Sequence, residues 1–414
     1  MSAGATWAGS HTYAAREVVS PRSAQEIQEL VRTEPRLRAL GSRHSFNDLA
    51  DSPGVLVSLA SLEDVPDLRG ERVRVPAGMR YGDLAVWLEE RGRALANLAS
   101  LPHISVAGAV ATGTHGSGVR NGSLAAAVAA LELVDGRGEL VRLMRGDADF
   151  EGAVVGLGAL GIVTALELDT DPTYVVTQNV HEGLTWDALL ADPWAVLGAA
   201  YSVSVFTNWT GDEVGQVWTK ERGEVAAAVP GATPAPEQRH MIAGMDPSLT
   251  TPQLGAPGPW HERIAHFKLG FLPSSGEELQ TEYLLPRTAA VPALGAMREL
   301  ADEIAPLLHV TELRTIAADR LWLSGAYGAD AIALHFTWLK EPAAVAALLP
   351  RLEERLLPLG GRPHWGKVFA ATAADLAPLY PRWADFADLV DRYDPEGRFA
   401  NEWSVRVLGR DVTP

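Results

Sequence analysis

Glu312 and Arg314 are residues whose types and spacing point to chemistry. They lie two positions apart in the stretch V-T-E-L-R-T-I (310–316), so on a strand their side chains share one face with apolar neighbours. Opposite charges on an apolar face indicate a partly buried pair. Such a pair is either a structural salt bridge or a site that binds a polar ligand with one acceptor and one fork of donors.

His335 and Thr337 repeat this pattern. In A-I-A-L-H-F-T-W-L (331–339) they alternate with apolar residues and share one face of the predicted strand. One interpretation is that they face the same cavity as Glu312 and Arg314. The other is an ordinary half-buried sheet face.

Lys367 and His44 are further candidates. Lys367 ends R-P-H-W-G-K (362–367), where a desolvated ammonium would polarise a hydroxyl or stabilise a developing anion. The alternative is a surface lysine beside a turn. His44 lies in G-S-R-H-S (41–45), directly after a predicted strand. It is either a turn histidine bonded to a carbonyl or a nucleophilic or covalently modified imidazole.

The stretch from Ser100 to Gly118 carries no formal charge and is dense in small residues. Small residues let the backbone approach a large ligand, and amides and hydroxyls there donate hydrogen bonds. This favours a cradle for an anionic, phosphate-bearing cofactor, with a tightly packed small-residue helix as the alternative. The segment T-G-T-H-G-S-G is not the G-x-G-x-x-G of a Rossmann turn, so nicotinamide binding is unsupported.

The composition is that of an acidic chain without cysteine. Its 414 residues predict two domains, and its net charge of −17 argues against nucleic acid or an anionic membrane as the main partner. The lack of cysteine excludes disulfides and thiolate metal sites. No H-E-x-x-H motif, signal peptide or long apolar run is present, so we expect no metal site and a cytoplasmic location.

Short elements that alternate between helix and strand must position these residues. In the first 170 residues we expect a helix from the capping box S-A-Q-E (23–26) and a hairpin around D-G-R-G (135–138). The other expected strands cover 37–40, 55–59, 73–75 and 161–168, and the other expected helices cover 81–91 and 150–160.

The later part of the chain predicts an antiparallel sheet with covering helices. Region 223–258 holds many prolines and is expected to be irregular, and the tail 376–398 is expected to be helical with breaks at Pro381 and Pro395. The expected strands cover 279–284, 310–316 and 332–339, and the expected helices cover 289–304 and 342–357.

Seven segments, taken in order, resemble the vanillyl-alcohol oxidase superfamily of FAD flavoproteins, and within it the alditol oxidase (xylitol or sorbitol oxidase) branch, next to the aldonolactone oxidases. They are G-S-R-H-S-F-N-D (41–48), A-S-L-P-H-I-S-V-A-G-A-V-A-T-G-T-H-G-S-G (99–118), L-G-A-L-G-I-V-T (157–164), G-P-W-H-E-R (258–263), E-L-R-T (312–315), R-P-H-W-G-K (362–367) and D-P-E-G-R-F-A-N (394–401).

The resemblance implies an α+β fold with two domains. Residues 1–172, together with the returning tail 370–414, would form a PCMH-type FAD-binding domain. Residues 173–369 would form a cap that binds substrate on an antiparallel sheet with covering helices.

The resemblance also implies that FAD is bonded covalently through His44. Arg43 departs from many superfamily members, which have glycine there. Further cofactor contacts are implied for Lys367 and, at the adenine end, for the backbone of Ile162. The remaining implied contacts come from two loops: Gly41, Ser42, Arg43 and Ser45 in the first, and Ser105, Gly108, Thr112, Gly113, His115, Gly116, Ser117 and Gly118 in the second.

The reaction implied by the resemblance is oxidation of the terminal primary hydroxyl of a linear alditol to an aldehyde, by hydride transfer to flavin N5, with O₂ reduced to H₂O₂. Glu312, Arg314 and Lys367 would be catalytic, and Ser105, Glu312, Arg314, His335 and Thr337 would bind substrate. We expect a monomer that binds no nucleic acid or membrane. The alternatives are an aldonolactone oxidase or dehydrogenase, and a non-catalytic polyol- or flavin-binding protein.

Overall fold

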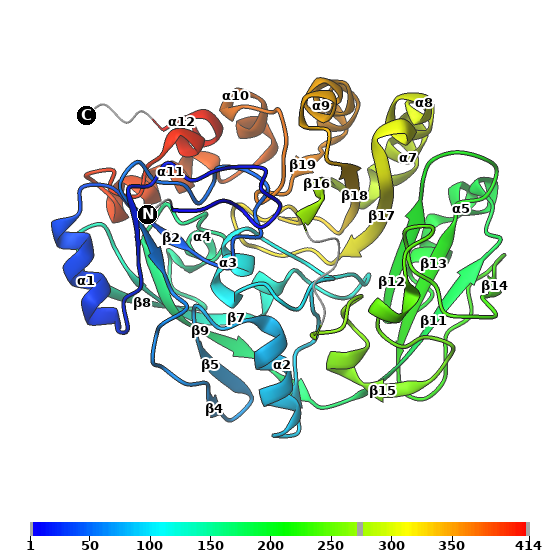
Figure 1. Cartoon of the computed structure of the whole chain (residues 1–414), viewed down its shortest axis with the longest axis horizontal. Coiled ribbons are helices and arrows are strands. Elements are labelled where there is room, and N and C mark those ends of the chain that lie inside the picture. The colour runs from blue at the N-terminus through cyan, green and yellow to red at the C-terminus, as the bar shows by residue number, and fades with distance from the viewer. Residues whose placement is uncertain (1–2, 271–275, 411–414) are drawn as a thin grey trace.

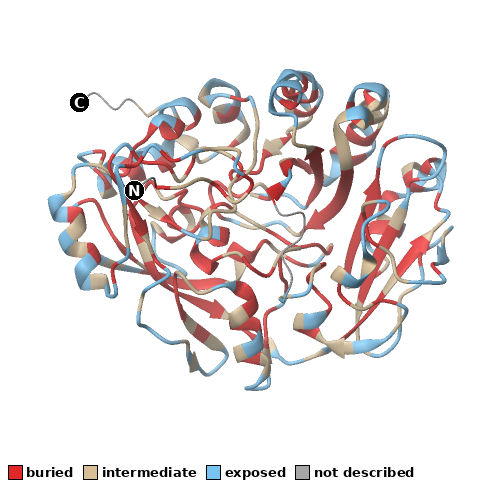
Figure 2. Ribbon diagram, viewed as in Figure 1, coloured by how far each residue is buried: buried red, intermediate tan, exposed pale blue. Residues whose placement is uncertain are grey.

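A computed structural model of the chain describes residues 3–270 and 276–410. It combines helices with two large antiparallel sheets that lie side by side (Figure 1). The strands of both sheets are largely buried, and the exposed residues lie on the outer faces of helices and in loops (Figure 2). This arrangement confirms the expected α+β class.

The N-terminal half contains a parallel sheet of order β1-β3-β2 and a sheet of order β4-β5-β9-β7-β8. Ser23 caps the first helix by accepting from the amide of Glu26, as the capping-box pattern predicts. Asp135 closes the predicted β7–β8 hairpin by accepting from the amides of Arg137 and Glu139. The strands are β1 (Glu17–Val19), β2 (Leu37–Leu40), β3 (Val55–Ser58), β4 (Asp67–Arg69), β5 (Arg72–Pro76), β7 (Val128–Val134), β8 (Leu140–Met144) and β9 (Ile162–Asp169), and a small pair joins β6 (Arg93–Ala94) to β10 (Asp171–Pro172). The helices are α1 (Ala24–Thr33), α2 (Tyr81–Glu89), α3 (Val106–Ala111) and α4 (Phe150–Ala153).

The helix expected over 150–160 is wrong in length, because α4 ends at Ala153. Leu157 and Gly158 have φ values of 53° and 66°, which a right-handed helix excludes. The carbonyl of Leu157 instead accepts a 2.7 Å hydrogen bond from the buried guanidinium of Arg38. The segment is therefore a loop.

The second half is built on a nine-stranded sheet of order β14-β11-β13-β12-β17-β18-β16-β19, with β15 also paired to β11. Leu313, Leu334 and Phe336 belong to a core cluster with residues of α7 and α9, so these helices cover one face of β16–β18 (Figure 1). The strands are β11 (Val175–Glu182), β12 (Ser202–Thr207), β13 (Gln216–Arg222), β14 (Thr233–Pro234), β15 (Pro257–Pro259), β16 (Glu278–Pro286), β17 (Leu308–Ile316), β18 (Ala331–Leu339) and β19 (Arg362–Pro363). The helices are α5 (Trp186–Ala191), α6 (Pro193–Leu197), α7 (Ala290–Glu299), α8 (Ala301–Ile304) and α9 (Pro342–Leu356). Region 223–258 is mostly irregular, as expected.

The C-terminal helices α10 (Ala373–Leu376), α11 (Trp383–Tyr393) and α12 (Glu402–Leu408) return to the N-terminal half. Arg36 donates to the carbonyl of Gly397 at 2.6 Å, and Asn401 donates to the carbonyl of Asp51 at 2.8 Å. These contacts attach the tail to the N-terminal half.

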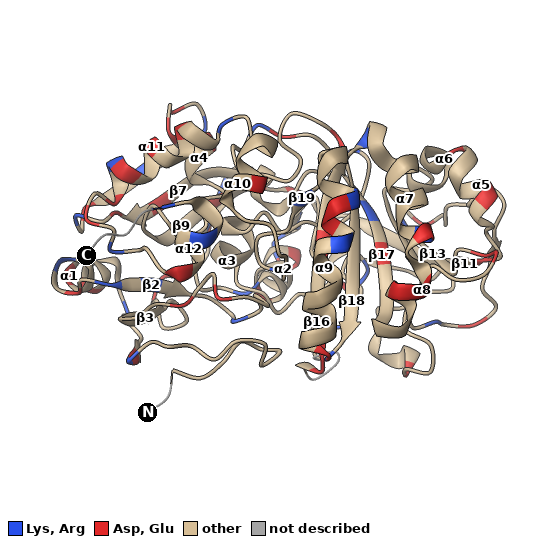
Figure 3. Cartoon of the chain, turned by 90° about the horizontal axis from the view of Figure 1, so that it is seen from above, with Lys and Arg blue, Asp and Glu red and all other residues tan. Residues whose placement is uncertain are grey.

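Acidic residues are spread over outer helices such as α5, α8, α9 and α11 (Figure 3). Within the described ranges, every helix is too short or too polar to traverse a lipid bilayer.

Candidate active site

A long cavity lies between the two sheets, and its lining comes from two contrasting surfaces. We call residues 41–45 and 104–112 the loop wall. The cavity-facing residues of β16, β17 and β18, together with Lys367, form the sheet wall. The lining also extends into the five-stranded sheet at Leu131, Leu133 and Val163.

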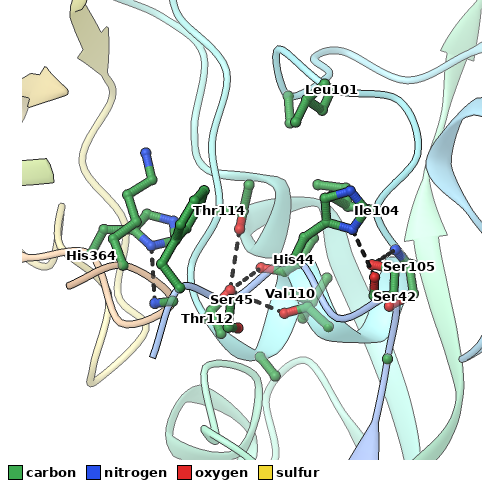
Figure 4. A pocket seen from close by; sticks show the side chains of 18 of the residues that line it. Ser42, His44, Ser45, Leu101, Ile104, Ser105, Val110, Thr112, Thr114 and His364 are labelled. Atoms are coloured by element: carbon green, nitrogen blue, oxygen red, sulfur yellow. Dashed lines mark hydrogen bonds between the residues drawn. The ribbon is translucent and has the colours of Figure 1, made fainter. Parts of the chain in front are cut away.

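The loop wall is held together through Ser42. Its hydroxyl accepts a 3.0 Å hydrogen bond from the amide of Ser105, and its carbonyl lies 2.8 Å from Nδ1 of His44 (Figure 4). A Cβ added at Gly41 would lie 2.6 Å from Oγ of Ser105, and one added at Gly108 would lie 2.8 Å from the same atom. Glycine at these positions leaves room around the Ser105 hydroxyl.

Two polar atoms of the loop wall are buried without a hydrogen-bond partner among the described residues: Oγ of Ser105 and Nε2 of His44. Ser105 stands at the N-terminus of α3, but its hydroxyl makes no capping bond. The His44 ring stacks on Trp7 at 5.3 Å. Burial lowers the pKa of His44 to about 4, so the ring is neutral at pH 7.

Arg43 adopts a left-handed backbone conformation with φ 62°. This conformation favours glycine. The guanidinium of Arg43 donates to the carbonyl of Ala3 at 2.8 Å and lies over the ring of Tyr13. Arg43 therefore attaches the loop to the N-terminal segment.

The sheet wall places three titratable residues in one row. Glu312 on β17 pairs with His335 on β18, which pairs with Glu282 on β16. Thr337 occupies the neighbouring position on the same face. The structure thus brings Glu312, Arg314, His335 and Thr337 into one cavity, as the strand alternation suggested.

Glu282 is a residue that the sequence reasoning missed. Its carboxylate lies 2.5 Å from Nη2 of Arg314 and 2.6 Å from Nζ of Lys367, and Nε2 of His115 is 3.2 Å away. Burial raises the pKa of Glu282, but the charges of Arg314 and Lys367 outweigh this effect and hold the pKa well below its usual range. The signal was available: in L-Q-T-E-Y-L (279–284), Glu282 shares the face of Gln280 between apolar positions.

Glu312 is held by His266, which the sequence reasoning also missed. Nε2 of His266 lies 2.7 Å from Oε1 of Glu312, whereas Nδ1 of His335 lies 3.3 Å from Oε2. Burial raises the pKa of Glu312, yet Arg314 and His266 bring it well below the usual value. The two ionised carboxylates therefore balance the two cations, Arg314 and Lys367.

His335 presents an unpartnered acceptor. Burial lowers its pKa to about 4, so the ring is neutral at pH 7. Because Nδ1 faces the carboxylate of Glu312, that nitrogen carries the proton. Nε2 then has a free lone pair and no partner among the described residues.

Part of the second predicted loop lies outside the cavity lining. Thr112 and His115 line the cavity, whereas residues 116–118 do not, and Ser117 and Gly118 bind the nine-stranded sheet instead. Ser117 accepts from the amide of Thr315 at 3.3 Å, and Gly118 donates to the carbonyl of Thr315 at 3.0 Å. These bonds fix β17 next to Arg314. The predicted contacts that do not line the cavity are Gly113, Gly116, Ser117, Gly118 and Ile162, although Gly161 and Val163 do.

The residues present fit an FAD molecule. The loop wall of the cavity offers backbone, glycines and an unpartnered hydroxyl, and its one charged residue, Arg43, is bound to the carbonyl of Ala3. A neutral buried imidazole with a free lone pair adjoins that wall. The site would hold the cofactor along residues 41–45 and 104–112, with Leu131, Leu133 and Leu160 at the far end.

Comparison with known proteins decides the family. Alditol oxidase from Streptomyces sp. strain IKD472 is 48% identical to this chain over 95% of it and 96% of the relative. The chain belongs to the alditol oxidase family of FAD-binding oxidoreductases. L-gulono-1,4-lactone dehydrogenase from Mycobacterium tuberculosis is 30% identical over 97% of this chain and 98% of the relative, and L-gulonolactone oxidase from Bos taurus is 22% identical over 97% of each.

Two family models divide between the two walls. An FAD binding domain matches residues 15–144, which contain the loop wall. D-arabinono-1,4-lactone oxidase matches residues 276–407, which contain the sheet wall. The two walls therefore lie in different matched segments: the loop wall lies in the segment that matches the FAD binding domain, and the sheet wall lies in the segment that matches the lactone oxidase model.

Proposed function

We propose that this protein oxidises the terminal primary hydroxyl of linear alditols such as xylitol and sorbitol to the aldehyde. The observation that carries the proposal is the sheet wall, which faces the loop wall across one cavity in a chain 48% identical to an alditol oxidase. Paired carboxylates and cations suit a substrate that has a hydroxyl on every carbon, because such a substrate needs acceptors and donors at several depths.

Glu312, Arg314, Thr337 and Ser105 bind the hydroxyls in this proposal. Glu312 accepts, Arg314 donates, and the hydroxyls of Thr337 and Ser105 do either. Each buried partner left unpaired costs about 1–3 kcal/mol, which favours a full-length polyol over a shorter or deoxygenated alcohol.

The reacting hydroxyl lies between His335 and the cations. Nε2 of His335 accepts the hydroxyl proton, because it is a neutral, buried acceptor without a partner among the described residues. Lys367 and Arg314, both anchored by Glu282, stabilise the negative charge that develops on the oxygen. FAD held along residues 41–45 and 104–112 would supply the acceptor for the hydride of the carbinol carbon, and O₂ would serve as the final oxidant with formation of H₂O₂.

His44 is the proposed covalent attachment point. Its ring is neutral, buried and stacked against Trp7, which holds it in one orientation at the loop wall. A monomer is the proposed active form.

Anaerobic mixing of the purified protein with xylitol tests the proposal. We expect the visible flavin absorbance to bleach and, on admission of O₂, to return with formation of H₂O₂. Because the lactone-oxidising relatives favour a second candidate, L-gulono-1,4-lactone and D-arabinono-1,4-lactone are tested in parallel. Bleaching by a lactone and not by xylitol would replace the proposal with that candidate, and no bleaching by either would contradict both.

A further inference from the structure

Lys220 is a buried lysine behind the sheet wall. It lies on β13, is 1% exposed and forms no ion pair with any carboxylate of the described residues. Its Nζ instead lies 2.5 Å from the carbonyl of Ile264, 3.1 Å from that of Ala265 and 2.9 Å from Nδ1 of His266. Burying an ammonium group without a paired carboxylate costs desolvation free energy. We therefore asked what Lys220 contributes at this position.

His266 links Lys220 to Glu312. Its Nε2 lies 2.7 Å from the ionised Glu312, which only accepts, so Nε2 must carry the ring proton. Burial lowers the pKa of His266 to about 4, and the neutral ring therefore has a lone pair at Nδ1. Lys220 donates to that lone pair. The two contacts together select one tautomer of His266.

The oxygens of Glu312 are consequently not equivalent. Oε1 is engaged by His266, whereas Oε2 has only longer contacts, 3.3 Å to Nδ1 of His335 and 3.6 Å to Nε of Arg314. Oε2 is the oxygen left to accept from a substrate hydroxyl. His266 itself lines the cavity, whereas Lys220 does not.

We infer that Lys220 and His266 are positioning residues for alditol binding: Lys220 fixes the tautomer of His266, and His266 orients the carboxylate of Glu312 toward the substrate. This inference rests on the proposed function. Both residues lie between the segments that the two family models match, 15–144 and 276–407.

The arrangement predicts a pH dependence of substrate binding. Burial lowers the pKa of Lys220 to about 7, although Glu312 opposes the shift. The charged or titratable groups that face Lys220 are His266, Glu312 and Arg314, since its partners Gln178 and Ser202 on the adjacent strands carry no charge. Deprotonated Lys220 accepts from Nδ1 of His266, which removes the proton from Nε2 and turns a lone pair toward Glu312. KM for xylitol should therefore rise above pH 7 while kcat stays unchanged.

The decisive experiment measures KM for xylitol after Lys220→Met in two backgrounds. In the parent we expect KM to rise about tenfold and its alkaline rise with pH to disappear, because one charge-assisted hydrogen bond is worth roughly this much. In the His266→Gln background the amide donates to Glu312 and has no tautomers. In this background Lys220→Met should change KM less than about twofold, because Lys220 no longer acts on Glu312 through a tautomer of residue 266.

An equal rise in both backgrounds would show that Lys220 only supports residues 264–266, and no rise in the parent would also overturn the inference. The matched control is Gln178→Met, which removes a buried side chain bonded to the nearby Thr251 and Pro252. This control should lower Tm and leave KM and its pH profile unchanged.

The pH profile of the unmodified protein keeps the inference testable even if a variant does not fold. A KM for xylitol that is flat from pH 6 to 9 would overturn it. Failure of the proposed function is distinguishable, because in that case xylitol would not reduce the flavin of the unmodified protein at all.

Discussion

The two walls of the cavity differ in how their polar groups are paired. The loop wall carries one formal charge, that of Arg43, which donates to the carbonyl of Ala3, and it leaves Oγ of Ser105 and Nε2 of His44 without partners in the described structure. The sheet wall is charged, but its carboxylates already hold Arg314, Lys367 and His266. The loop wall therefore leaves neutral polar groups for a ligand, whereas the sheet wall leaves Nε2 of His335 and has Glu282 and Glu312 paired before any ligand arrives.

The difference teaches which wall suits which molecule. A cofactor that stays bound supplies a permanent partner, so Nε2 of His44 is satisfied throughout turnover. A substrate that enters and leaves supplies no permanent partner. An unpaired buried charge in the sheet wall would therefore carry its full desolvation cost each time the site is empty. Pairing through Glu282 and His266 keeps the sheet wall oriented when it is empty.

The largest effect is expected from Glu282→Gln, which breaks the pairing of the sheet wall. Arg314 and Lys367 would be left as buried, uncompensated cations, so the free energy of unfolding should fall by about 3–5 kcal/mol and the rate of flavin reduction by more than about 100-fold. Denaturant unfolding and anaerobic rapid mixing measure these quantities.

The matched control is Glu353→Gln on α9. Glu353 accepts from the hydroxyl of Tyr283 and the amide of Ala370, and burial raises its pKa. Its loss should reduce stability slightly and leave flavin reduction intact. Equal effects of the two substitutions would show that the sheet wall needs no paired carboxylate.

His44→Ala tests the loop wall. If His44 holds the cofactor covalently, acid precipitation of the variant should release all of its flavin into the supernatant, while the unmodified protein retains flavin in the pellet. His11→Ala, which removes an imidazole paired with Asp51 instead, should still retain it. Acid-stable flavin in the His44 variant would contradict the assignment.

The acid limb of activity should come from His335. With its pKa lowered to about 4, the ring stays neutral well below the usual histidine range, so kcat/KM should fall only as the pH approaches 4. The free energy of unfolding also decreases toward acid pH. Between pH 6.5 and 4 the unfolded chain binds protons that the buried ring does not, so the free energy of unfolding decreases as the pH falls through this window. An acid limb of kcat/KM with an apparent pKa of 6.5 would contradict a buried, neutral His335.

The smallest effect is expected from Ser105→Ala. The substitution removes an unpartnered hydroxyl and no internal hydrogen bond of its side chain, so Tm should be unchanged within error. KM for xylitol should rise about threefold to tenfold, because one substrate hydroxyl loses a partner. An unchanged KM would remove Ser105 from the substrate site.

The sequence predicts the loop wall more completely than the sheet wall for a physical reason. Residues 41–45 and 104–112 are short local segments, so their small residues and hydroxyls appear together in the sequence. Alternation along each strand also predicts that Glu312 and His335 face one side. No local pattern shows that Glu282 lies beside them, because this depends on the order β17-β18-β16.

Two other differences have the same origin. The predicted helix over 150–160 fails because tertiary contacts hold Leu157 and Gly158 in left-handed conformations. Residues 116–118 resemble the rest of the glycine-rich loop in composition, yet Ser117 and Gly118 bind β17. A glycine-rich composition indicates that another group comes close to the backbone. It does not indicate whether that group is a ligand or a neighbouring strand.

The central claim is that the sheet wall binds the alditol while the loop wall holds the flavin. The most direct test is anaerobic flavin reduction by increasing xylitol in the unmodified protein and in Glu312→Gln. We predict that the substitution raises the half-saturating xylitol concentration at least about tenfold and leaves flavin content and its oxidised spectrum unchanged. An unchanged half-saturating concentration, or loss of the flavin itself, would contradict the division of roles between the two walls.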